Sequence, residues 1–596
     1  MKKVFTPIFF LLIFPHFLQG QGLTTLFEKS GGTQSPAYAD IISWWQQLDK
    51  QSDYIKMMPM GMSDAGFPLH LVLVSADKDF SIPSLKKKNK RIILVMNGIH
   101  PGEPDGIDAS MVLCRNISNG LYNHAAERKS GGGRTAVAKP DYLLPDNVVL
   151  AIIPVYNIGG CLNSSANYRI DQNGPEEKGF RGNSENLDLN RDFIKSDSKE
   201  ARSFAEIFHL LDPDVFVDNH VSDGADYQHV MTLLTTQHNK LGGDMGQYLD
   251  SLFEPALYGM MKAKGFDLVP YVNSFGDTPE TGWPEYWDSP RYSSGYATLW
   301  QTFAFVPETH MLKPYKQRVE ATRSLMECFI EFTSANSEKI KTIREQAREL
   351  VKTQTVFPIA WSLDKSTYKE ITFLGYEAGH KPSEVSGLPR LYYDRNKPFE
   401  KKVKIFNYYA VKNVIIRPKA YIIPQGWWKV IELLQLNKVN MRRLTHDSLV
   451  TVRAYHIDDY KTAPRQYEMH HPNSEVKISS TVKQVQFHTG DWFIPFNQVA
   501  NRFLLETLEP QGEDSYFSWN FFDAILGQKE GYSGYSFEDI AADFLQKNPS
   551  ARKELEDKKS TDTAFAKDGR AQLNFVYQHS PYFETNYMNY PVYRVE

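Results

Sequence analysis

The stretch Arg91–Ser110, RIILVMNGIHPGEPDGIDAS, joins a strand-like run to a helix-like run through a short loop. The apolar run Ile92–Met96 is typical of a strand that is buried on both faces. The loop after it contains His100 and, three residues later, Glu103. In open α/β sheets the crevice at the carboxyl ends of the strands is where ligands bind. We therefore expect His100 and Glu103 to lie at such a crevice.

Short β-rich runs alternate with helix-like runs from Met57 to about Tyr315. The helix-like runs, such as KEARSFAEIFHLL at 199–211, carry apolar residues at helical spacing. Strands that alternate with helices predict an α/β fold with a mixed, largely parallel sheet sandwiched by helices. The strand-like runs are LHLVLVS (69–75), RIILVMNGI (91–99), NVVLAIIPVYN (147–157) and DVFVDNH (214–220).

Beyond Thr355 the sequence changes to aromatic-rich, alternating runs, with one helix-like run, QGWWKVIELLQLNK at 425–438. A chain of 596 residues is long for one domain and natural for two or three. We predict a first α/β domain at 21–340 and a C-terminal mixed α/β domain at 355–596. Helix-like segments at 316–354 are expected to close the first domain or to connect it to the second.

The N-terminus resembles a secretory signal peptide. Lys2 and Lys3 precede the apolar block Phe9–Leu18, and Gly20 offers a small residue for cleavage. We therefore expect residues 1–20 to be removed and the chain to be secreted or periplasmic, without a lipoprotein cysteine. No later run approaches the roughly 18 apolar residues of a membrane helix, so no membrane span is expected.

Composition excludes some classes of function. The net charge is −4, from 67 basic and 71 acidic residues, so no nucleic-acid partner is expected. The basic cluster KKKNKR at 86–91 is predicted to be a solvated loop. Three cysteines allow at most one intrachain disulfide, and buried apolar cysteine is the default for Cys114, Cys161 and Cys328. The oligomeric state is not indicated.

A second strand-like run, DVFVDNHVSD, also ends on a histidine, His220. Two histidines and Glu103 at neighbouring strand ends would form a catalytic zinc set, which keeps one position for water. Taken singly, either histidine could be an ordinary strand-end residue. A second His-x-x-Glu, His124–Glu127, lies in a polar stretch and is expected to be an exposed pair, as is the adjacent pair His470–His471.

Between these two strand ends lies FRGNSENLDLNRDF at 180–193, too polar for a core strand. With this motif the region from about Ser35 to Ala335 resembles the zinc metallocarboxypeptidase family of carboxypeptidases A and T. The resemblance implies that His100, Glu103 and His220 hold one Zn²⁺. It also implies that residues 21–340 are the catalytic domain and that 355–596 are an accessory domain of unknown role.

The resemblance also assigns roles within the polar motif. Asn190 and Arg191 match the pair that binds the terminal carboxylate of the substrate, for which the planar guanidinium of arginine is suited. Asp188 matches the acid that orients a zinc-binding histidine. Arg181 falls where the family has an arginine that polarises the scissile carbonyl. The insertion DQNGPEEKG leaves Arg169 as the alternative.

Two further residues follow from later motifs. Glu308, in LWQTFAFVPETHMLKP, stands at the end of an apolar strand, as the general base of the family does. RYSSGYATLW resembles the family's tyrosine-containing loop, in which Tyr292 is the better match and Tyr296 the next. The neighbouring residues at 297–299 are uncharged, which disfavours a pocket for basic side chains.

The function implied is that of an exported zinc metallocarboxypeptidase, which hydrolyses C-terminal amide bonds of peptides with Glu308 as general base. Two other hydrolases remain open, an N-acyl amino acid deacylase of the aspartoacylase type and a hydrolase of cell-wall stem peptides. A non-enzymatic alternative is a peptide-binding protein on an inactive scaffold.

Overall fold

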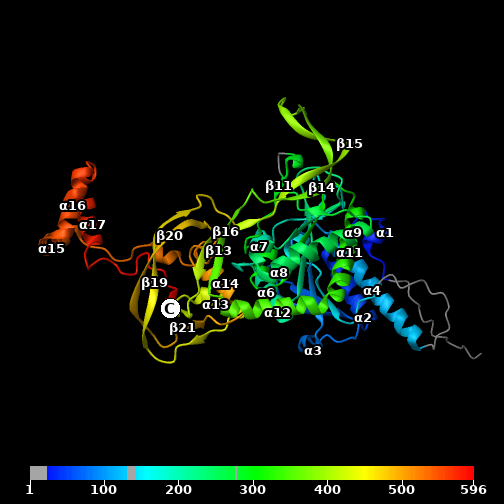
Figure 1. The fold of residues 1–596 in the computed structure, drawn as a ribbon, viewed down its shortest axis with the longest axis horizontal. Helices are drawn as coiled ribbons and strands as arrows, with labels where there is room; N and C mark the ends of the chain where they lie inside the picture. Colours follow the sequence, from blue (N-terminus) through cyan, green and yellow to red (C-terminus); the bar gives the residue numbers. More distant parts are fainter. Residues whose placement is uncertain (1–22, 130–142, 275–277) are drawn as a thin grey trace, which may run out of the picture.

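The first half of the chain is built on a central nine-stranded sheet (Figure 1). The computed structural model describes residues 23–129, 143–274 and 278–596, so the expected signal peptide lies outside the described residues. The strand order is β1-β2-β4-β3-β7-β12-β9-β10, with β8 beside β12. The strands are β1 (Ile55–Met62), β2 (Pro68–Ser75), β3 (Arg91–Met96), β4 (Val148–Ile153), β7 (Val215–Asp218), β8 (His220–Ser222), β9 (Met231–Thr235), β10 (Val269–Pro270) and β12 (Phe303–His310).

The centre of this sheet is parallel and its flanks are mixed. β3 pairs in parallel with β4 and β7, and β12 pairs in parallel with β7 and β8. β1, β2 and β9 join the sheet through antiparallel pairs. Every residue of β3 and β4 is buried, which explains why both read as uninterrupted apolar runs. The predicted α/β fold with a mixed, largely parallel sheet is confirmed.

Helices flank the sheet. α11 packs on β3 and β4 and against α4, and α6 packs on β1 and β2. The helices predicted from apolar spacing are present, and the segment at 316–354 divides into α11 and α12 at Asn336. The helices of this half are α1 (Leu26–Lys29), α2 (Tyr38–Gln51), α3 (Ile82–Lys87), α4 (Asp105–Lys129), α5 (Ile158–Leu162), α6 (Lys199–Leu211), α7 (His238–Leu241), α8 (Gly243–Tyr248), α9 (Glu254–Ala263), α10 (Ser293–Thr298), α11 (Tyr315–Ala335) and α12 (Ser337–Thr353).

The region after Thr355 is rich in β-structure and makes direct contact with the first half. A six-stranded sheet has the order β18-β21-β17-β22-β19-β20. A long hairpin, β14–β15, extends the short strand β11 (Trp283–Pro284) of the first half, with Trp283 opposite Ile405. The strands are β13 (Val356–Leu363), β14 (Lys369–Pro382), β15 (Pro389–Phe406), β16 (Tyr409–Ile416), β17 (Ala420–Ile423), β18 (Arg442–Arg443), β19 (Ser448–Thr462), β20 (Asn473–Phe487), β21 (Trp492–Pro495) and β22 (Tyr593–Val595).

The helices of this second region pack in two separate hydrophobic cores. α13, which the sequence predicted, and α14 bury apolar residues in the large core that both halves share. The last three helices pack around a small separate core that includes Phe537 and Val576, and they project from the rest of the molecule (Figure 1). The helices are α13 (Trp428–Leu436), α14 (Asn501–Leu508), α15 (Gly534–Lys547), α16 (Pro549–Thr561) and α17 (Gly569–Gln578).

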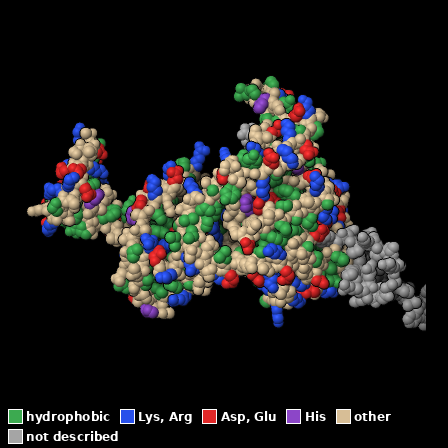
Figure 2. All heavy atoms as spheres, viewed as in Figure 1, with side chains coloured by type: hydrophobic (Ala, Val, Ile, Leu, Met, Phe, Trp, Pro, Cys, Tyr) green, Lys and Arg blue, Asp and Glu red, His purple; other side chains and the backbone are tan. Residues whose placement is uncertain are grey.

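The basic cluster at 86–91 is only partly the solvated loop that the sequence predicted. Lys90 is buried and its Nζ lies 2.6 Å from Asp77, while Arg91 is buried with Nη1 2.9 Å from Asp214. These carboxylates come from other loops, so the local charge pattern gave no sign of them. On the face shown in Figure 2, basic and acidic side chains are interspersed.

The three cysteines are buried and unpaired, as the composition favoured. Among the described helices, none is long and apolar enough to cross a membrane.

Candidate functional site

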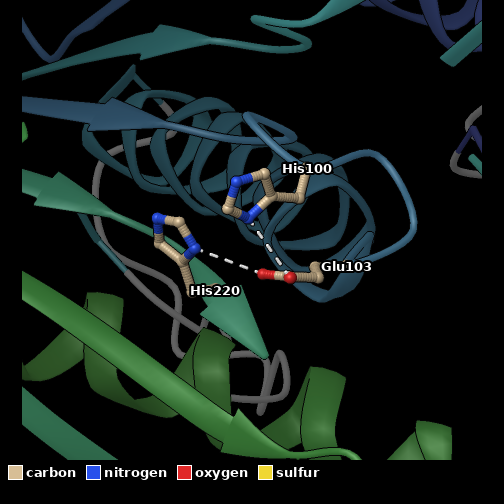
Figure 3. Close-up of side chains that lie close together, drawn as sticks. All are labelled: His100, Glu103 and His220. Atoms are coloured by element: carbon tan, nitrogen blue, oxygen red, sulfur yellow. Dashed lines mark hydrogen bonds and ion pairs between the residues drawn. The ribbon is translucent and has the colours of Figure 1, made fainter. Parts of the chain in front are cut away.

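His100, Glu103 and His220 converge at the carboxyl edge of the sheet (Figure 3). His100 and Glu103 lie between β3 and α4, and His220 begins β8, directly after β7. Because β3 and β7 are parallel neighbours, their carboxyl ends meet at one edge. Nδ1 of His100 lies 3.2 Å from Oε1 of Glu103, and Nδ1 of His220 lies 3.2 Å from Oε2.

A glycine permits this close arrangement of strand ends and helix. A Cβ on Gly106, in the first turn of α4, would lie 2.4 Å from Oδ1 of Asn97 and 2.6 Å from the Cβ of Asn219. Real Cβ atoms do not approach that closely, so only glycine allows α4 to start against the ends of β3 and β7. The start of α4 in turn fixes Glu103 between the two histidines.

The three side chains fit a zinc ion. Their ligand atoms, two imidazole nitrogens and a carboxylate oxygen, lie within 4.8 Å of one another, and all three residues are buried. This donor set is typical of catalytic zinc. Burial alone would raise the pKa of Glu103, but the charges of Arg169 and His100 hold that pKa well below its ordinary value. Glu103 is therefore an anion, as a metal ligand must be.

Each histidine is oriented by a carboxylate on its other nitrogen. Nε2 of His100 lies 3.0 Å from Oδ1 of Asp188, and Nε2 of His220 lies 2.9 Å from Oδ2 of Asp218. Both contacts direct Nδ1 toward Glu103, where a metal would bind. Asp218 was not predicted from the sequence. The only signal for it was its position two residues before His220 in VFVDNH.

The turn Asp188–Arg191 brings the predicted carboxylate-binding pair beside this centre. Asp188 caps the turn, and its Oδ1 accepts a hydrogen bond from the backbone N–H of Asn190 at 2.9 Å. The backbone N–H of Ser293 donates to Oδ1 of Asn190 at 3.4 Å. The Arg191 guanidinium lies 4.7 Å from the ring centroid of Tyr292. The polar motif and the tyrosine loop therefore form one wall.

Both candidate arginines reach the centre. Nε and Nη2 of Arg181 lie 3.0 and 2.9 Å from Oδ2 of Asp188, and its side chain is 47% exposed. Nη1 of Arg169 lies 2.9 Å from Oε1 of Glu103, and its Nη2 donates to the carbonyl of Val221 at 3.1 Å. Arg181 is the more exposed of the two, so a carbonyl could approach its guanidinium, whereas Arg169 is held against Glu103.

Glu308 lies on β12, opposite His220 in the parallel pairing with β8. Burial raises the pKa of Glu308 to about 8, although the charge of His220 opposes that rise. Tyr296, the second choice for the loop tyrosine, is fully buried, and its hydroxyl donates to Oδ1 of Asn437 at 2.6 Å. Tyr292 is thus the tyrosine of that loop that faces the centre.

One cavity of about 370 Å³ is lined by the three candidate metal ligands, both candidate arginines, Asn190, Arg191, Tyr292 and Glu308. One part of its wall, which the sequence did not predict, is apolar and aromatic and includes Leu234, Val306 and Tyr286. The lining residues are His100, Glu103, Arg169, Arg181, Asn190, Arg191, His220, Val221, Ser222, Asp223, Leu234, Tyr271, Tyr286, Tyr292, Ser293, Ser294, Val306 and Glu308.

The other histidine candidates do not join the centre. His470 is half-buried, and its Nε2 lies 2.9 Å from Asp197, so the expectation of an exposed pair is wrong for His470 and holds for His471. The partner of His470 is distant in sequence, which is why the motif alone missed it. The side chains of His124 and Glu127 lie outside the described residues.

Comparison with known proteins matches the region that carries these motifs. Residues 41–209 match the family model described as zinc carboxypeptidase. This span includes His100, Glu103, Asp188, Asn190 and Arg191 and ends before His220 and Glu308. The resemblance predicted from the sequence is confirmed, and with it the expectation of a zinc metallopeptidase.

Several similar proteins are named as carboxypeptidases. Carboxypeptidase 2 of Trichophyton rubrum is 20% identical over 522 residues, which cover 84% of this chain and 87% of that protein. Carboxypeptidase 2 of Trichophyton tonsurans is 20% identical over 486 residues, which cover 78% and 80%. Among solved structures, the carboxypeptidase A of Helicoverpa armigera is 13% identical, covers 51% of this chain and 74% of its own, and gives a TM-score of 0.37.

Proposed function

We propose that this chain, which carries a zinc carboxypeptidase domain, is an exported exopeptidase that removes apolar or aromatic residues from the C-termini of peptides. One observation carries the proposal. Asn190 and Arg191, suited to a terminal carboxylate, share a cavity with the zinc-type centre and with Glu308. A clamp for a free carboxylate at that position would place the last amide bond of a peptide beside the centre.

The side-chain preference rests on the apolar part of the cavity wall. Leu234 and Val306 are 7% and 6% exposed, and Tyr271 and Tyr286, in the same lining, pack edge to face against each other. An apolar side chain of the substrate would bury against these residues, whereas a lysine or arginine there would lose its hydration. Asp223 also lines the cavity, and the peptide library described below measures the side-chain preference.

Each residue has a definite task in the proposed reaction. A zinc ion held by His100, Glu103 and His220 would supply Lewis acidity and lower the pKa of bound water. Glu308 would accept a proton from the attacking water and deliver it to the leaving amine. Arg181 would stabilise negative charge that develops on the carbonyl oxygen, with Arg169 as the alternative.

The proposal includes the division of the chain. Residues 1–20 would be a cleaved signal peptide, 21–340 the catalytic domain, and 355–596 an accessory region. The buried, oriented ligand set and the presence of Glu308 favour an enzyme over a peptide-binding scaffold.

Paired peptides test this function. The zinc-loaded enzyme is incubated with a peptide library in free-acid and C-terminally amidated forms, and the products are identified by mass spectrometry. We expect stepwise loss of single C-terminal residues from the free acids and resistance of the amides, because Arg191 would face a neutral group. Arg191→Ala should lose this discrimination, whereas Arg390→Ala, an exposed arginine on the β14–β15 hairpin, should keep it.

Other outcomes point elsewhere. Cleavage at internal bonds, or equal loss of the amides, would overturn the proposal. Release of acyl groups from N-acyl amino acids alone would favour a deacylase, and cleavage restricted to stem peptides would favour a cell-wall hydrolase.

A further inference from the structure

The region after residue 355 contacts the proposed catalytic domain, residues 21–340 and here called the catalytic half, at the turn Asp188–Arg191. The carboxylate of Glu468 accepts a hydrogen bond from the backbone N–H of Asp188 at 2.9 Å, across 280 residues of sequence. Asp188 is the residue that orients His100, and its turn carries Asn190 and Arg191. Glu468, which lies outside the catalytic half, therefore holds the backbone of the turn that carries Asp188, Asn190 and Arg191.

Glu468 occupies an unusual backbone position. Tyr467 and His470 exchange backbone hydrogen bonds of 2.7 and 3.0 Å, which closes a two-residue turn of Glu468 and Met469. Both turn residues have positive φ, 49° and 67°. Such turns favour Asn-Gly, because other side chains are strained there. Strained backbone is retained where the surrounding structure imposes it, and here the turn points Glu468 at Asp188.

Contacts on both sides of Glu468 fix this turn, one to the catalytic half and one to its own region. Nε2 of His470 lies 2.9 Å from Asp197, and the Tyr467 ring stacks on Trp519 with centroids 6.1 Å apart. Trp519 is fully buried, and Lys195 Nζ lies 5.6 Å from its ring centroid. The turn therefore sits between a buried tryptophan of its own region and the segment 188–198.

The tyrosine loop is held by the same region. Asp514 Oδ2 accepts a hydrogen bond from the backbone N–H of Arg291 at 2.8 Å, and Asp514 Oδ1 lies 2.7 Å from the Arg291 guanidinium. Ser289 Oγ donates to Glu513 at 2.6 Å. Tyr292, which stacks on Arg191, directly follows Arg291. Both segments that would bind the substrate carboxylate thus depend on residues beyond 460.

We infer that the Tyr467–His470 turn is part of the substrate-binding apparatus and that Glu468 is a positioning residue. By accepting the Asp188 N–H it sets the turn that presents Asn190 and Arg191 to the terminal carboxylate. The kinetic part of this inference rests on the proposed function, whereas the structural part does not.

Four full-length proteins test it. Glu468→Ala removes the acceptor, and Glu468→Gln keeps an acceptor oxygen without the charge. Glu475→Ala is the matched control, since Glu475 also has a positive φ, 51°, and its carboxylate pairs with Lys461 on the surface. Hydrogen–deuterium exchange of the peptide that contains 188–193 is measured with kcat and KM for a free-acid peptide.

In Glu468→Ala we expect faster exchange at 188–193 and a KM raised about 10-fold or more, because a hydrogen bond to a charged group is lost. The change in kcat should be smaller than the change in KM. Glu468→Gln should restore slow exchange and most of the affinity, and Glu475→Ala should match the wild type. Should Glu468→Ala not fold, Glu468→Asp, whose carboxylate is one methylene shorter, replaces it with the same expectations.

Unchanged exchange in Glu468→Ala, or an equal effect in Glu475→Ala, would overturn the inference. A glutamine variant as impaired as the alanine variant would also overturn it, because the hydrogen bond would then not be the cause. If the wild type fails to distinguish free acids from amides, the proposed function fails, and the exchange data still decide the role of Glu468.

Discussion

Replacing Glu308 with glutamine separates chemistry from metal binding. Glutamine has the same size as glutamate, so the packing of β12 against β8 is preserved, but its amide does not accept a proton as a base. His100, Glu103 and His220 are a complete ligand set without Glu308, so the zinc content should stay the same. We expect kcat to fall about 10²–10⁴-fold, the usual loss for a general acid–base.

This fall corresponds to about 2.7–5.4 kcal/mol of activation free energy, since each tenfold change is about 1.36 kcal/mol. The assay is hydrolysis of a free-acid peptide by zinc-loaded protein, with zinc measured by elemental analysis. Glu254→Gln is the control, because burial also raises the pKa of Glu254 to about 7 and this residue contacts Tyr258 rather than the cavity. It should keep full activity.

The pH dependence of the wild type adds an independent check. Glu308 must be ionised to accept a proton, so kcat/KM should fall as the pH drops through its pKa. Burial raises that pKa from 4.5 to about 8, and a bound cation lowers it again, so the acid limb should lie between those values. Turnover of Glu308→Gln near that of the wild type, or loss of zinc, would refute the assignment.

Two further predictions concern the metal and the thiols. The purified protein should contain one zinc, and His100→Ala should abolish its binding. Asp218→Asn should weaken zinc affinity about 10–100-fold, measured by competition with a chelator, because His220 loses the carboxylate that orients it. Full retention of zinc in either variant would contradict the site. Burial raises the pKa of Cys161 and Cys328 to about 12, so in the folded protein a thiol reagent at pH 8 should modify neither, whereas unfolded protein should react fully.

Local patterns were sufficient to predict the core of the fold. The apolar run at 92–96 predicted a strand buried on both faces, and this run forms most of β3, which lies between β4 and β7. The apolar spacing at 199–211 gave both ends of α6. These predictions succeeded because each depends on residues adjacent in the chain.

The sequence predicted that His100 and Glu103 would meet the distant His220, but other contacts between distant segments were not predicted. Nothing near Lys90 indicates that Asp77 makes it a buried ion pair. The resemblance favoured Tyr292 over Tyr296 in RYSSGYATLW, but that Tyr296 is fully buried in the core depends on the packing of α10. Leu234 and Val306 read as ordinary strand residues, although they line the cavity. Each of these outcomes depends on a partner that the local pattern does not contain.

The two partners of the hydrogen bond between Asp188 and Glu468 are synthesised at different times. Chains are synthesised from the N-terminus at about 5–20 residues per second, so the 280 residues between these two positions take about 14–56 s to appear. His100 and Glu103 are made before Asp188, and His220 and Glu308 are made within this interval. Until Glu468 is made, the turn with Asn190 and Arg191 lacks the carboxylate that accepts the Asp188 N–H. In the growing polypeptide the residues that would bind zinc are therefore made before the acceptor that supports the turn with Asn190 and Arg191, which becomes available only when residue 468 has been synthesised.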